Sequence, residues 1–541
     1  MTKELSGDAR IDGLLTTVSG LSSPVLSWQT ANELGVGVSL DYSFLSAGTN
    51  GVGGFVAMDA GLQANTLTAL QHFSDVANVT FNLVGAGLGD MNFGTAALPS
   101  SGSSFTAGVA YSSYSYYPQY AWTTNSNVYL TNTASGYDEA NVGDSSYTTL
   151  LHEIAHALGV EHPFEDILVP VGTDSDKYTV MSYTEYYPSG VNPASLMLYD
   201  MLTIQYLYGA NHSYNAGDTV IDVAAFLADG PRALWDGAGE DTIDLNGLGA
   251  GIDFDLTEGA FNTVFNTDDF VIAYGAEIEN VIGTAFGDTL TGTAGANVIE
   301  GKGGADTIDA GDGNDSVYGG NGANEIYLGK GKDFVKAGGG DESFFGGNGK
   351  DTISYYDSTG GVTIDLRSDA VSGSWADGDT ITNFESAKGS KNGADDISGT
   401  DGKNTLRSYG GEDSLYGRDG KDKLYGGDND DKLYGGGGAD KLYGGKGADR
   451  FDGGKGDDIL FGGGGADIFH FDHGEDSDTI KDFEDDVDLI QIDNFTFTGG
   501  QTAFSFATQV DADVVFDFGS GDTLTVENAT IAQLSNDLDV V

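Results

Sequence analysis

Residues 435–443 read GGGGADKLY and residues 453–461 read GGKGDDILF, and units of this kind repeat without gaps. Eight nonapeptides run from Gly283 to Ser354, and eight more run from Gly399 to His470. Position 8 is apolar in all sixteen units, and position 6 is Asp in twelve. These arrays hold 42 of the 84 glycines of the chain. The glycine excess therefore belongs to a nine-residue repeat in which each unit supplies one inward side chain.

The repeat predicts a calcium-binding parallel β-roll. Glycine-rich turns reach positive φ values, and the short strand after each turn buries its central residue against neighbouring coils. Two units make one coil, so position-6 carboxylates 18 residues apart lie in adjacent coils and share Ca²⁺ with turn carbonyls. A disordered Gly/Asp tract is the alternative, but it has no reason to keep an apolar residue at every ninth position. The expected calcium ligands are Asp288, Asp306, Asp315, Asp333, Asp351, Asp413, Asp422, Asp431, Asp440, Asp449, Asp458 and Asp467.

Composition excludes several classes of protein. The 541 residues predict several domains, and the absence of cysteine rules out disulfides, thiolate metal sites and cysteine nucleophiles. Lys plus Arg is 23 against 83 Asp plus Glu, a formal charge of −60 that repels nucleic acid and anionic membranes. The first residues lack the apolar core of a Sec signal, and no apolar run is long enough to span a membrane. We therefore expect neither nucleic-acid binding nor membrane insertion.

The candidate catalytic residues lie in HEIAHALGVEH, residues 152–162. His152 and His156 share one helix face with Glu153 beside them. Gly159 is able to end the helix in a left-handed conformation and turn the chain back, so that His162 supplies a third nitrogen. Three imidazoles leave Zn²⁺ an open position for water. A structural helix or an inactive zinc site is the alternative, and the added third histidine makes both less favoured than catalysis.

The residues Val180-Met181-Ser182-Tyr183 supply the Met-turn of metzincins. The nonapeptide arrays resemble RTX repeats. The arrays, the zinc signature and this turn together resemble the serralysins, which are secreted bacterial zinc endopeptidases, and the resemblance covers nearly the whole chain. The resemblance implies that Met181 lies under the zinc and that Tyr183 is a mobile fifth ligand able to stabilise the oxyanion. Only 18 residues separate His162 from Met181, a shorter loop than many serralysins carry, so side-chain preferences cannot be transferred.

The expected function is a secreted, calcium-stabilised zinc endopeptidase. One zinc ion activates a water, Glu153 takes its proton as general base, and the nucleophile attacks a peptide carbonyl. The alternative is a noncatalytic RTX adhesin or surface protein with a vestigial metzincin domain, which the intact Glu153 disfavours. An RTX lipase requires a G-x-S-x-G motif that the sequence lacks. Expected partners are protein or peptide substrates, a type I secretion apparatus and, as an open possibility, a proteinaceous inhibitor.

The fold class expected is multidomain. An α+β metzincin-type protease domain precedes an all-β parallel β-roll and sandwich region, which looks duplicated because VTIDL (362–366) resembles IDFDL (252–256). The expected divisions are an N-terminal segment with an open propeptide role at 1–19, a catalytic domain at 20–212, a β region with the first roll at 213–354, linking strands with the second roll at 355–470, and a C-terminal β region with the secretion signal at 471–541.

Four further segments carry expectations. Residues 59–79 show apolar spacing typical of a core helix, including Leu67. VYLTN (128–132) is either the edge strand that pairs with substrate or an ordinary buried strand. The terminal Asp537-Leu538-Asp539-Val540-Val541 is either part of the secretion signal or a plain edge strand. Tyrosines 18 residues apart, such as Tyr425 and Tyr443, should stack on an outer face, as a binding stripe or as ordinary surface.

The remaining histidines are isolated in the sequence. His72, His212, His470 and His473 have no partner at ligand-type spacing, so we expect surface or capping roles for them.

Overall fold

The computed structural model describes residues 37–47, 55–96, 98, 100–101, 104–105, 108–117, 120–131, 142–160, 162, 173–188, 191–265, 268–495 and 502–540, with the backbone alone at several positions between 100 and 131. The expected N-terminal segment at 1–19 lies outside these residues. The described part is mostly β, with few helices. None of its helices has the length and apolar character to cross a membrane.

The chain forms two compact units: one comprises residues up to Gly247 with Asp253–Asn280, and the other comprises Leu248–Ile252 with Val281–Val541. The first unit contains a five-stranded sheet in the order β2-β1-β3-β7-β6. All neighbouring pairs are parallel except β7 with β6. The strands are β1 (Val38–Phe44), β2 (Val79–Leu83), β3 (Met91–Ala96), β6 (Gly108–Tyr117) and β7 (Tyr120–Thr131).

The strand expected at the sheet edge is internal. Residues 128–131 belong to β7, which pairs with β3 on one side and with β6 on the other. Val128, Tyr129 and Leu130 are fully buried, as an internal strand requires. The edge expectation for these residues is therefore wrong, because β-branched and aromatic composition marks a buried strand without saying which neighbours it has. The edge strand beside β7 is β6.

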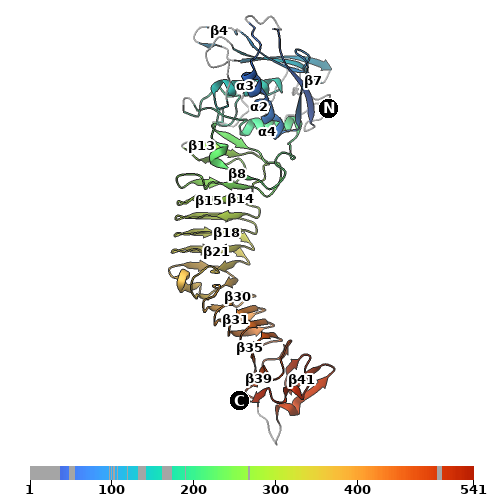
Figure 1. Cartoon of the computed structure of the whole chain (residues 1–541), viewed down its shortest axis with the longest axis vertical. Coiled ribbons are helices and arrows are strands. Elements are labelled where there is room, and N and C mark those ends of the chain that lie inside the picture. Colours follow the sequence, from blue (N-terminus) through green and yellow to red (C-terminus); the bar gives the residue numbers. More distant parts are fainter. Residues whose placement is uncertain are drawn as a thin grey trace. The chain divides into compact units, whose positions relative to one another are not determined.

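Three helices of the first unit are α2 (Ala60–Val76), α3 (Ser145–Ala157) and α4 (Leu198–Tyr208), labelled in Figure 1. The Asp59 side chain accepts a 2.8 Å hydrogen bond from the Leu62 backbone N–H and so caps α2. Leu67, expected in the core, is 44% exposed, and Thr66 and Ala69 are buried instead. Shorter elements of this unit are β4 (Ser100–Ser101), β5 (Ser104–Phe105), β8 (Val220–Asp222), α5 (Val223–Phe226), β9 (Arg232–Leu234), β10 (Thr242–Asp244), β11 (Asp253–Asp255), β12 (Phe261–Thr263) and β13 (Asp268–Ile272).

The second unit is a parallel β-roll, as expected from the repeat. Successive strands enter different sheets and return to the same sheet one coil later (Figure 1). One sheet contains β16 (Val298–Glu300), β18 (Ser316–Tyr318), β21 (Phe334–Lys336), β24 (Thr352–Ser354), β28 (Ser386–Lys388), β30 (Thr405–Gly410), β32 (Lys423–Asp428), β34 (Lys441–Lys446), β36 (Ile459–Gly464) and β38 (Ser477–Ile480).

Two sheets complete the coils on the other side. The first array uses β15 (Thr289–Thr293), β17 (Thr307–Gly311), β19 (Glu325–Tyr327), β22 (Ser343–Phe345) and β27 (Thr380–Thr382). The second array uses β25 (Thr363–Asp365), β29 (Asp396–Ser398), β31 (Ser414–Gly420), β33 (Lys432–Gly438), β35 (Arg450–Lys455), β37 (Ile468–Phe471), β39 (Leu489–Ile492) and β43 (Leu538–Val540).

The roll core consists of the position-8 side chains. All sixteen of them, from Leu290 to Phe469, are 1% exposed or less. Each of these side chains contacts apolar neighbours in its own coil and in the adjacent coils, and this shared burial stabilises the stack.

The segment between the arrays continues the roll. Strand β28 pairs in parallel with β24 of the first array and β30 of the second, so one sheet crosses the junction without a break. On the other side, β27 ends the sheet of the first array and β25 begins that of the second. This segment is therefore part of the solenoid on one side and changes sheets only on the other.

The C-terminal part closes the roll. Strands β40 (Ala507–Val510), β41 (Asp513–Gly519) and β42 (Asp522–Val526) are antiparallel to one another, and β42 pairs with β38. Residues 538–540 form β43, which pairs with β39 at the end of its sheet. The terminal residues thus form an edge strand, and their role in secretion stays a prediction.

Coil stacking predicts a strict glycine requirement at one turn position. A Cβ atom on Gly438 would lie 1.4 Å from the Gly420 carbonyl oxygen of the previous coil, and Gly438 has φ of +142°. We expect Gly438→Ala to lower the free energy of unfolding by at least about 2 kcal/mol, from the clash and the strained backbone. Gly464→Ala is the control, because a Cβ there meets nothing within 4 Å. It should change stability by no more than about 0.5 kcal/mol.

Urea unfolding of both variants at saturating calcium gives the comparison. Equal stability of the two variants would contradict close coil stacking at Gly438.

Candidate active site and metal centres

Helix α3 presents the first two histidines and Glu153. Leu150, Leu151 and Ile154 are fully buried and anchor the helix in the first unit. Asp144 occupies the N-cap position, but its side chain makes no capping hydrogen bond. The four-residue spacing places His152 and His156 on one face, with ring centroids 4.7 Å apart.

The chain turns back toward α3 directly after the helix. Gly159 has φ of +96°, the positive value expected for the residue that reverses the chain. The Val160 carbonyl then accepts a 2.8 Å hydrogen bond from His156 Nδ1. His162 follows, and its Nε2 lies 3.0 Å from Nε2 of His152 and 3.1 Å from Nε2 of His156. The third histidine therefore joins the first two.

The hydrogen bonds of these histidines determine which nitrogens are free for a metal. Nδ1 of His152 donates to the Val180 carbonyl at 2.8 Å, as Nδ1 of His156 does to Val160. Their Nε2 atoms are then unprotonated and face Nε2 of His162, so each of the two offers a lone pair to a metal ion. Ligand nitrogens around a tetrahedral zinc at 2.0–2.1 Å lie about 3.3 Å apart. The donor set thus fits zinc in chemistry and in spacing.

The turn that contains Met181 contacts the candidate site through the Val180 carbonyl. Met181 is fully buried, and its backbone N–H donates to the Thr179 hydroxyl at 3.0 Å. The turn is braced by Asp200, whose carboxylate accepts from the Thr179 hydroxyl at 2.5 Å and from the Val180 backbone N–H at 2.9 Å. Because the Val180 carbonyl orients His152, Asp200 positions a metal ligand indirectly.

Asp200 was not anticipated from the sequence. It lies in α4 and is completely buried, and burial raises its pKa to about 6 despite its three hydrogen bonds. The available signal was an acidic residue in the first turn of an otherwise apolar helix, YDMLTIQYLY. Its partner turn lies 20 residues upstream, so local spacing does not reveal the contact.

Glu153 follows His152 in α3 and is buried. Its side chain is 6% exposed, and the Ala110 backbone N–H of β6 hydrogen-bonds to its carboxylate. Burial raises the pKa of Glu153 to about 8, and the Ala110 bond partly offsets that rise. A nearby dication would counteract the rise by favouring the carboxylate.

Tyr183 reaches the same nitrogens from the Met-turn. Its hydroxyl lies 2.8 Å from His162 Nε2, and its ring stacks on His152 with centroids 5.4 Å apart. The side chain is 69% exposed, so little packing holds it in this position. All residues of the candidate zinc site are therefore brought together.

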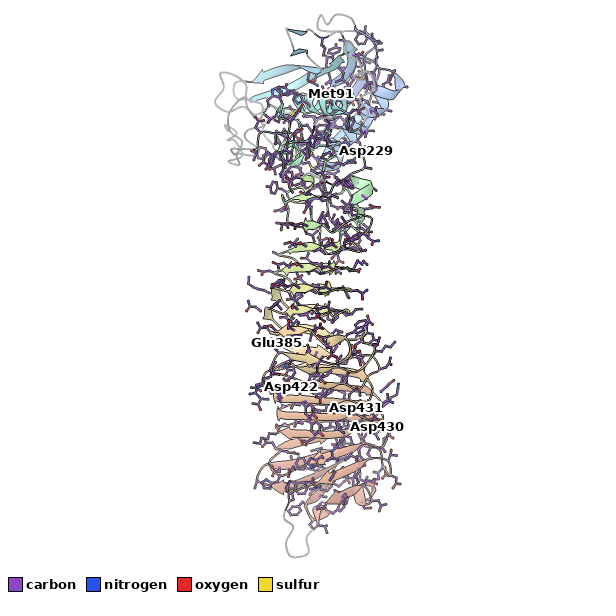
Figure 2. The ribbon with its side chains drawn as sticks, turned by 90° about the vertical axis from the view of Figure 1, so that its left-hand side faces the viewer. Met91, Asp229, Glu385, Asp422, Asp430 and Asp431 are labelled. Atoms are coloured by element: carbon purple, nitrogen blue, oxygen red, sulfur yellow. The ribbon has the colours of Figure 1, made fainter. Side chains whose placement is uncertain are left out.

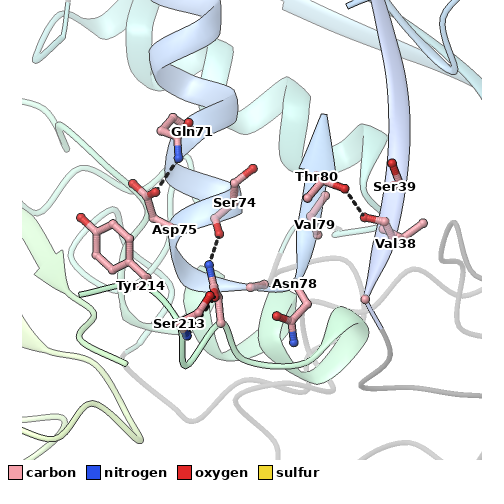
Figure 3. Close-up of a pocket in the computed structure, with 13 residues that line it drawn as sticks. Val38, Ser39, Gln71, Ser74, Asp75, Asn78, Val79, Thr80, Ser213 and Tyr214 are labelled. Carbon is pink, nitrogen blue, oxygen red and sulfur yellow. Dashed lines mark hydrogen bonds between the residues drawn. The ribbon is translucent and has the colours of Figure 1, made fainter. Parts of the chain in front are cut away.

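A hollow of about 610 Å³ in the first unit contains none of these residues. It lies between the end of α2 and strands β1 and β2 (Figure 3). Its lining includes Gln71 and Asp75, which bond to each other at 2.6 Å, and Asn211, which donates to the Ser74 carbonyl. These polar groups satisfy one another, so the hollow offers no convergent chemistry.

The position-6 aspartates form two rows along the roll. Asp422 precedes β32 in one sheet, whereas Asp431 precedes β33 in the other, and both are labelled in Figure 2. All twelve predicted aspartates are 3% exposed or less. In the regular coils, Oδ1 of each accepts from the backbone N–H of the position-6 residue one coil earlier, as Asp440 does from Asp422 at 2.7 Å. Carboxylates 18 residues apart are therefore neighbours.

The second oxygen of these carboxylates has no donor among the described residues. Ten Oδ2 atoms are buried in this way: those of Asp306, Asp315, Asp333, Asp351, Asp413, Asp422, Asp431, Asp440, Asp449 and Asp458. Glycine at position 1 keeps space beside seven of them, because a Cβ there would approach Oδ2, as one on Gly426 would lie 2.4 Å from Asp431 Oδ2. A hard cation such as Ca²⁺ binds buried oxygens that have no hydrogen-bond donor and have space beside them.

The first array departs from this pattern at Asn297, an amide at position 6, and at two further places. Both oxygens of Asp288 accept hydrogen bonds, from Ile252 and from Thr284, so Asp288 lacks an unpaired oxygen. The Asn324 amide donates to Glu342 at 2.7 Å, which puts an N–H group where other coils have unpaired oxygens. The second array is the more regular of the two.

The structure adds a pair of acidic residues outside the arrays. Asp236 and Asp241 are fully buried in the first unit, and neither oxygen of Asp236 nor Oδ2 of Asp241 has a donor among the described residues. Burial and the Asp241 charge raise the pKa of Asp236 to about 7. The stretch DGAGED (236–241) has the glycine-rich acidic character of the repeat, which was the signal available for them.

The expected tyrosine stack is confirmed. Tyr425 and Tyr443 lie with ring centroids 4.8 Å apart and planes 5° apart. Phe461 continues the stack beyond Tyr443 at 4.7 Å, and the Arg407 guanidinium lies 4.5 Å from the Tyr425 ring centroid. These rings are half-buried, so part of their surface already packs within the sheet.

Comparison with known proteins supports both parts of the site. The family described as RTX calcium-binding nonapeptide repeat (4 copies) matches residues 282–317, 318–353, 391–424, 409–442, 416–451, 434–469 and 443–480. Extracellular lipase LipA from Serratia marcescens superposes with a TM-score of 0.21 at 16% identity, covering 57% of this chain and 45% of that chain. A likeness this weak carries no argument.

Two relatives match at higher identity. Metallopeptidase AprA of Pseudomonas marginalis is 32% identical over 299 residues, 47% of this chain and 60% of that protein. Serralysin B of Dickeya chrysanthemi is 32% identical over 304 residues, 50% of this chain and 62% of that protein. The chain thus spans less than two thirds of the length of these relatives. The resemblance to serralysin metalloproteases is confirmed over about half the chain, and the arrays are RTX calcium-binding repeats.

Proposed function

We propose that the chain is a secreted zinc endopeptidase, stabilised by calcium, that hydrolyses peptide bonds of extracellular proteins. The observation that carries the proposal is the convergence of three imidazole rings: Nε2 of His162 lies 3.0 Å from that of His152 and 3.1 Å from that of His156. Glu153, the neighbour of His152 in α3, is buried. Two of these imidazoles are oriented by Nδ1 hydrogen bonds to backbone carbonyls, and this is how zinc-binding histidines are usually held. A noncatalytic protein would have no use for the general base beside them.

Zinc held by His152, His156 and His162 would supply Lewis acidity and acidify a water. Glu153 takes a proton from that water and returns it to the leaving amine. The Glu153 side chain is 6% exposed, so its carboxylate is shielded from bulk solvent. The Tyr183 hydroxyl, 2.8 Å from His162 Nε2, then donates to the developing oxyanion. Met181 and Gly159 serve structural roles, the first beneath the histidines and the second at the reversal.

Strand β6 is the element we assign to substrate alignment. It is the antiparallel edge of the sheet, and its Ala110 N–H bonds to Glu153. An extended peptide that adds to this edge would bring its scissile carbonyl to Glu153.

We further propose the division of the chain stated from the sequence, with a metzincin-type catalytic domain at 20–212 and a duplicated roll region after it. The similar strand stretches at 252–256 and 362–366 support the duplication. Export through a type I secretion apparatus is part of this proposal, because the acidic roll requires calcium to fold and would stay unfolded at cytosolic calcium. A proteinaceous inhibitor is a further partner that the sequence leaves open.

The zinc site predicts different losses for the general base and a ligand. Glu153→Ala should keep zinc and lower kcat/KM by about 10²- to 10⁴-fold, because only the proton acceptor is removed. His156→Ala should lose both zinc and activity. Zinc analysis paired with casein digestion measures both properties. Near wild-type proteolysis by Glu153→Ala would exclude the assignment.

Tyr183 should act mainly in the transition state. Tyr183→Phe should lower kcat by about 10²-fold and leave KM nearly unchanged, because the hydroxyl bonds to the oxyanion and hardly to substrate. Tyr186→Phe is the matched control, since its hydroxyl bonds to Asp268 at 2.7 Å instead. A rise in KM alone for Tyr183→Phe would contradict this role.

The buried carboxylates predict a pH response that calcium reverses. Burial raises the pKa of Asp431 and of Asp458 to about 8, against about 3.9 in an unfolded chain. Because the folded pKa is the higher one, the calcium-free roll should be most stable below about pH 4 and lose stability as pH rises to about 8. Calcium takes the place of the proton, so its stabilising effect should be largest near pH 8 and vanish near pH 4.

Thermal unfolding at pH 4, 6 and 8, with chelator or with calcium, measures this response. A calcium-free chain that gains stability between pH 4 and pH 8 would show that the unpaired oxygens are not protonated in the roll.

A further inference from the structure

Asp452, His470 and Glu475 form a cluster at the end of the second array. One ligand atom from each lies within 4.8 Å of the others. Asp452 in β35 and His470 in β37 are paired in register, one coil apart. Glu475 follows β37 in a turn and is 8% exposed, and its carbonyl accepts from the Gly456 N–H. Three separate stretches of backbone therefore fix the three side chains.

The second nitrogen of His470 sets the direction of its lone pair. Nε2 donates to Asp493 Oδ2 at 2.7 Å, directly beyond β39. Nδ1 is then the unprotonated nitrogen, and it is buried with no hydrogen-bond partner among the described residues. It lies 3.7 Å from Asp452 Oδ2, beyond hydrogen-bond distance. Metal-bound histidines commonly donate one ring N–H to a carboxylate, which leaves the other ring nitrogen for the metal. His470 has this arrangement: Nε2 donates to Asp493, and Nδ1 faces the acidic oxygens.

The charges around the cluster favour a cation. Asp472 and Asp458 add negative charge, against the single cationic side chain of Arg450. Burial, together with the Asp452 and Asp472 carboxylates, raises the pKa of Glu475 to about 8. Asp452 remains one-third exposed, so an ion has a route from solvent.

The donor set differs from that of the calcium rows. Those rows offer oxygen alone, which suits Ca²⁺, whereas imidazole nitrogen with two carboxylates suits a first-row divalent transition metal. The other occupant is a proton: a doubly protonated His470 would bridge Asp452 and Asp493. That arrangement would draw Nδ1 and Asp452 into hydrogen-bond distance, whereas they stand 3.7 Å apart.

We propose that Asp452, His470 and Glu475 bind a divalent transition-metal ion of the zinc class, with Asp493 as the positioning residue for His470. This ion is separate from the calcium ions and from the three-histidine centre. It ties β35, β37 and the following turn together where the nonapeptide pattern stops.

The test uses the full-length chain with His152→Ala and His156→Ala, which removes the candidate catalytic centre. With calcium saturating, zinc is added and bound metal is counted by elemental analysis and by titration calorimetry. We expect one zinc per chain in this background and none after the further change His470→Gln. Glu475→Gln should weaken binding at least 10-fold. His473→Gln is the control, because its side chain is 58% exposed, and it should keep the zinc.

Absence of zinc binding in the background, or equal binding after His470→Gln, would overturn the proposal. If the background variant does not fold, the comparison is made in the unaltered chain, where His470→Gln should hold one zinc fewer. Equal zinc content in that comparison would also overturn the proposal. Because the count in the background does not use the catalytic centre, failure of the proposed protease function would leave it unchanged.

Discussion

Ten buried carboxylate oxygens without a donor set the condition on which the roll depends. Each position-6 aspartate is held by its Oδ1, which accepts a backbone N–H from the neighbouring coil, so Oδ2 cannot turn toward solvent. In seven of these ten units, glycine at position 1 leaves a space beside Oδ2 that a side chain would fill. Burying such charges is costly unless a cation or a proton accompanies them. Folding of the roll and binding of cations are therefore one process.

The sequence was most informative where structure is local or periodic. Sixteen position-8 residues from Leu290 to Phe469 were expected in the core and are buried, because period nine leaves one inward side chain per unit. HEIAHALGVEH contains three histidines within eleven residues, and helix geometry places the first two on one face. Strand neighbours could not be derived in this way. For Val128 the sequence left an edge strand and a buried strand as alternatives; the strand is buried and β6 pairs with it, a pairing that composition does not encode.

Two positions were missed for a shared reason. Asp200 supports the Met-turn across 20 residues, and His470 meets Asp452 across one coil, so in both cases the partner is distant along the chain. His470 looked isolated because ligand motifs are searched at helical or short-loop spacing. In a roll the relevant spacing is one coil. Position 9 of every unit lies beside position 9 two units away, so the repeat itself predicts the meeting of Asp452 and His470.

The candidate zinc and calcium sites differ in the number of residues on which their geometry depends. The three histidines lie on one helix and the reversal after it, so their geometry depends on few residues. A calcium site joins two coils, and each coil needs its neighbours for a core. Interruptions should therefore act locally in the roll. Asn324 and Glu342 bond to each other and remove one pair of unpaired oxygens, yet Asp315 and Asp333 nearby keep theirs. Because stability in a solenoid is a sum over neighbouring coils, the first array tolerates such gaps as long as the remaining sites hold their cations.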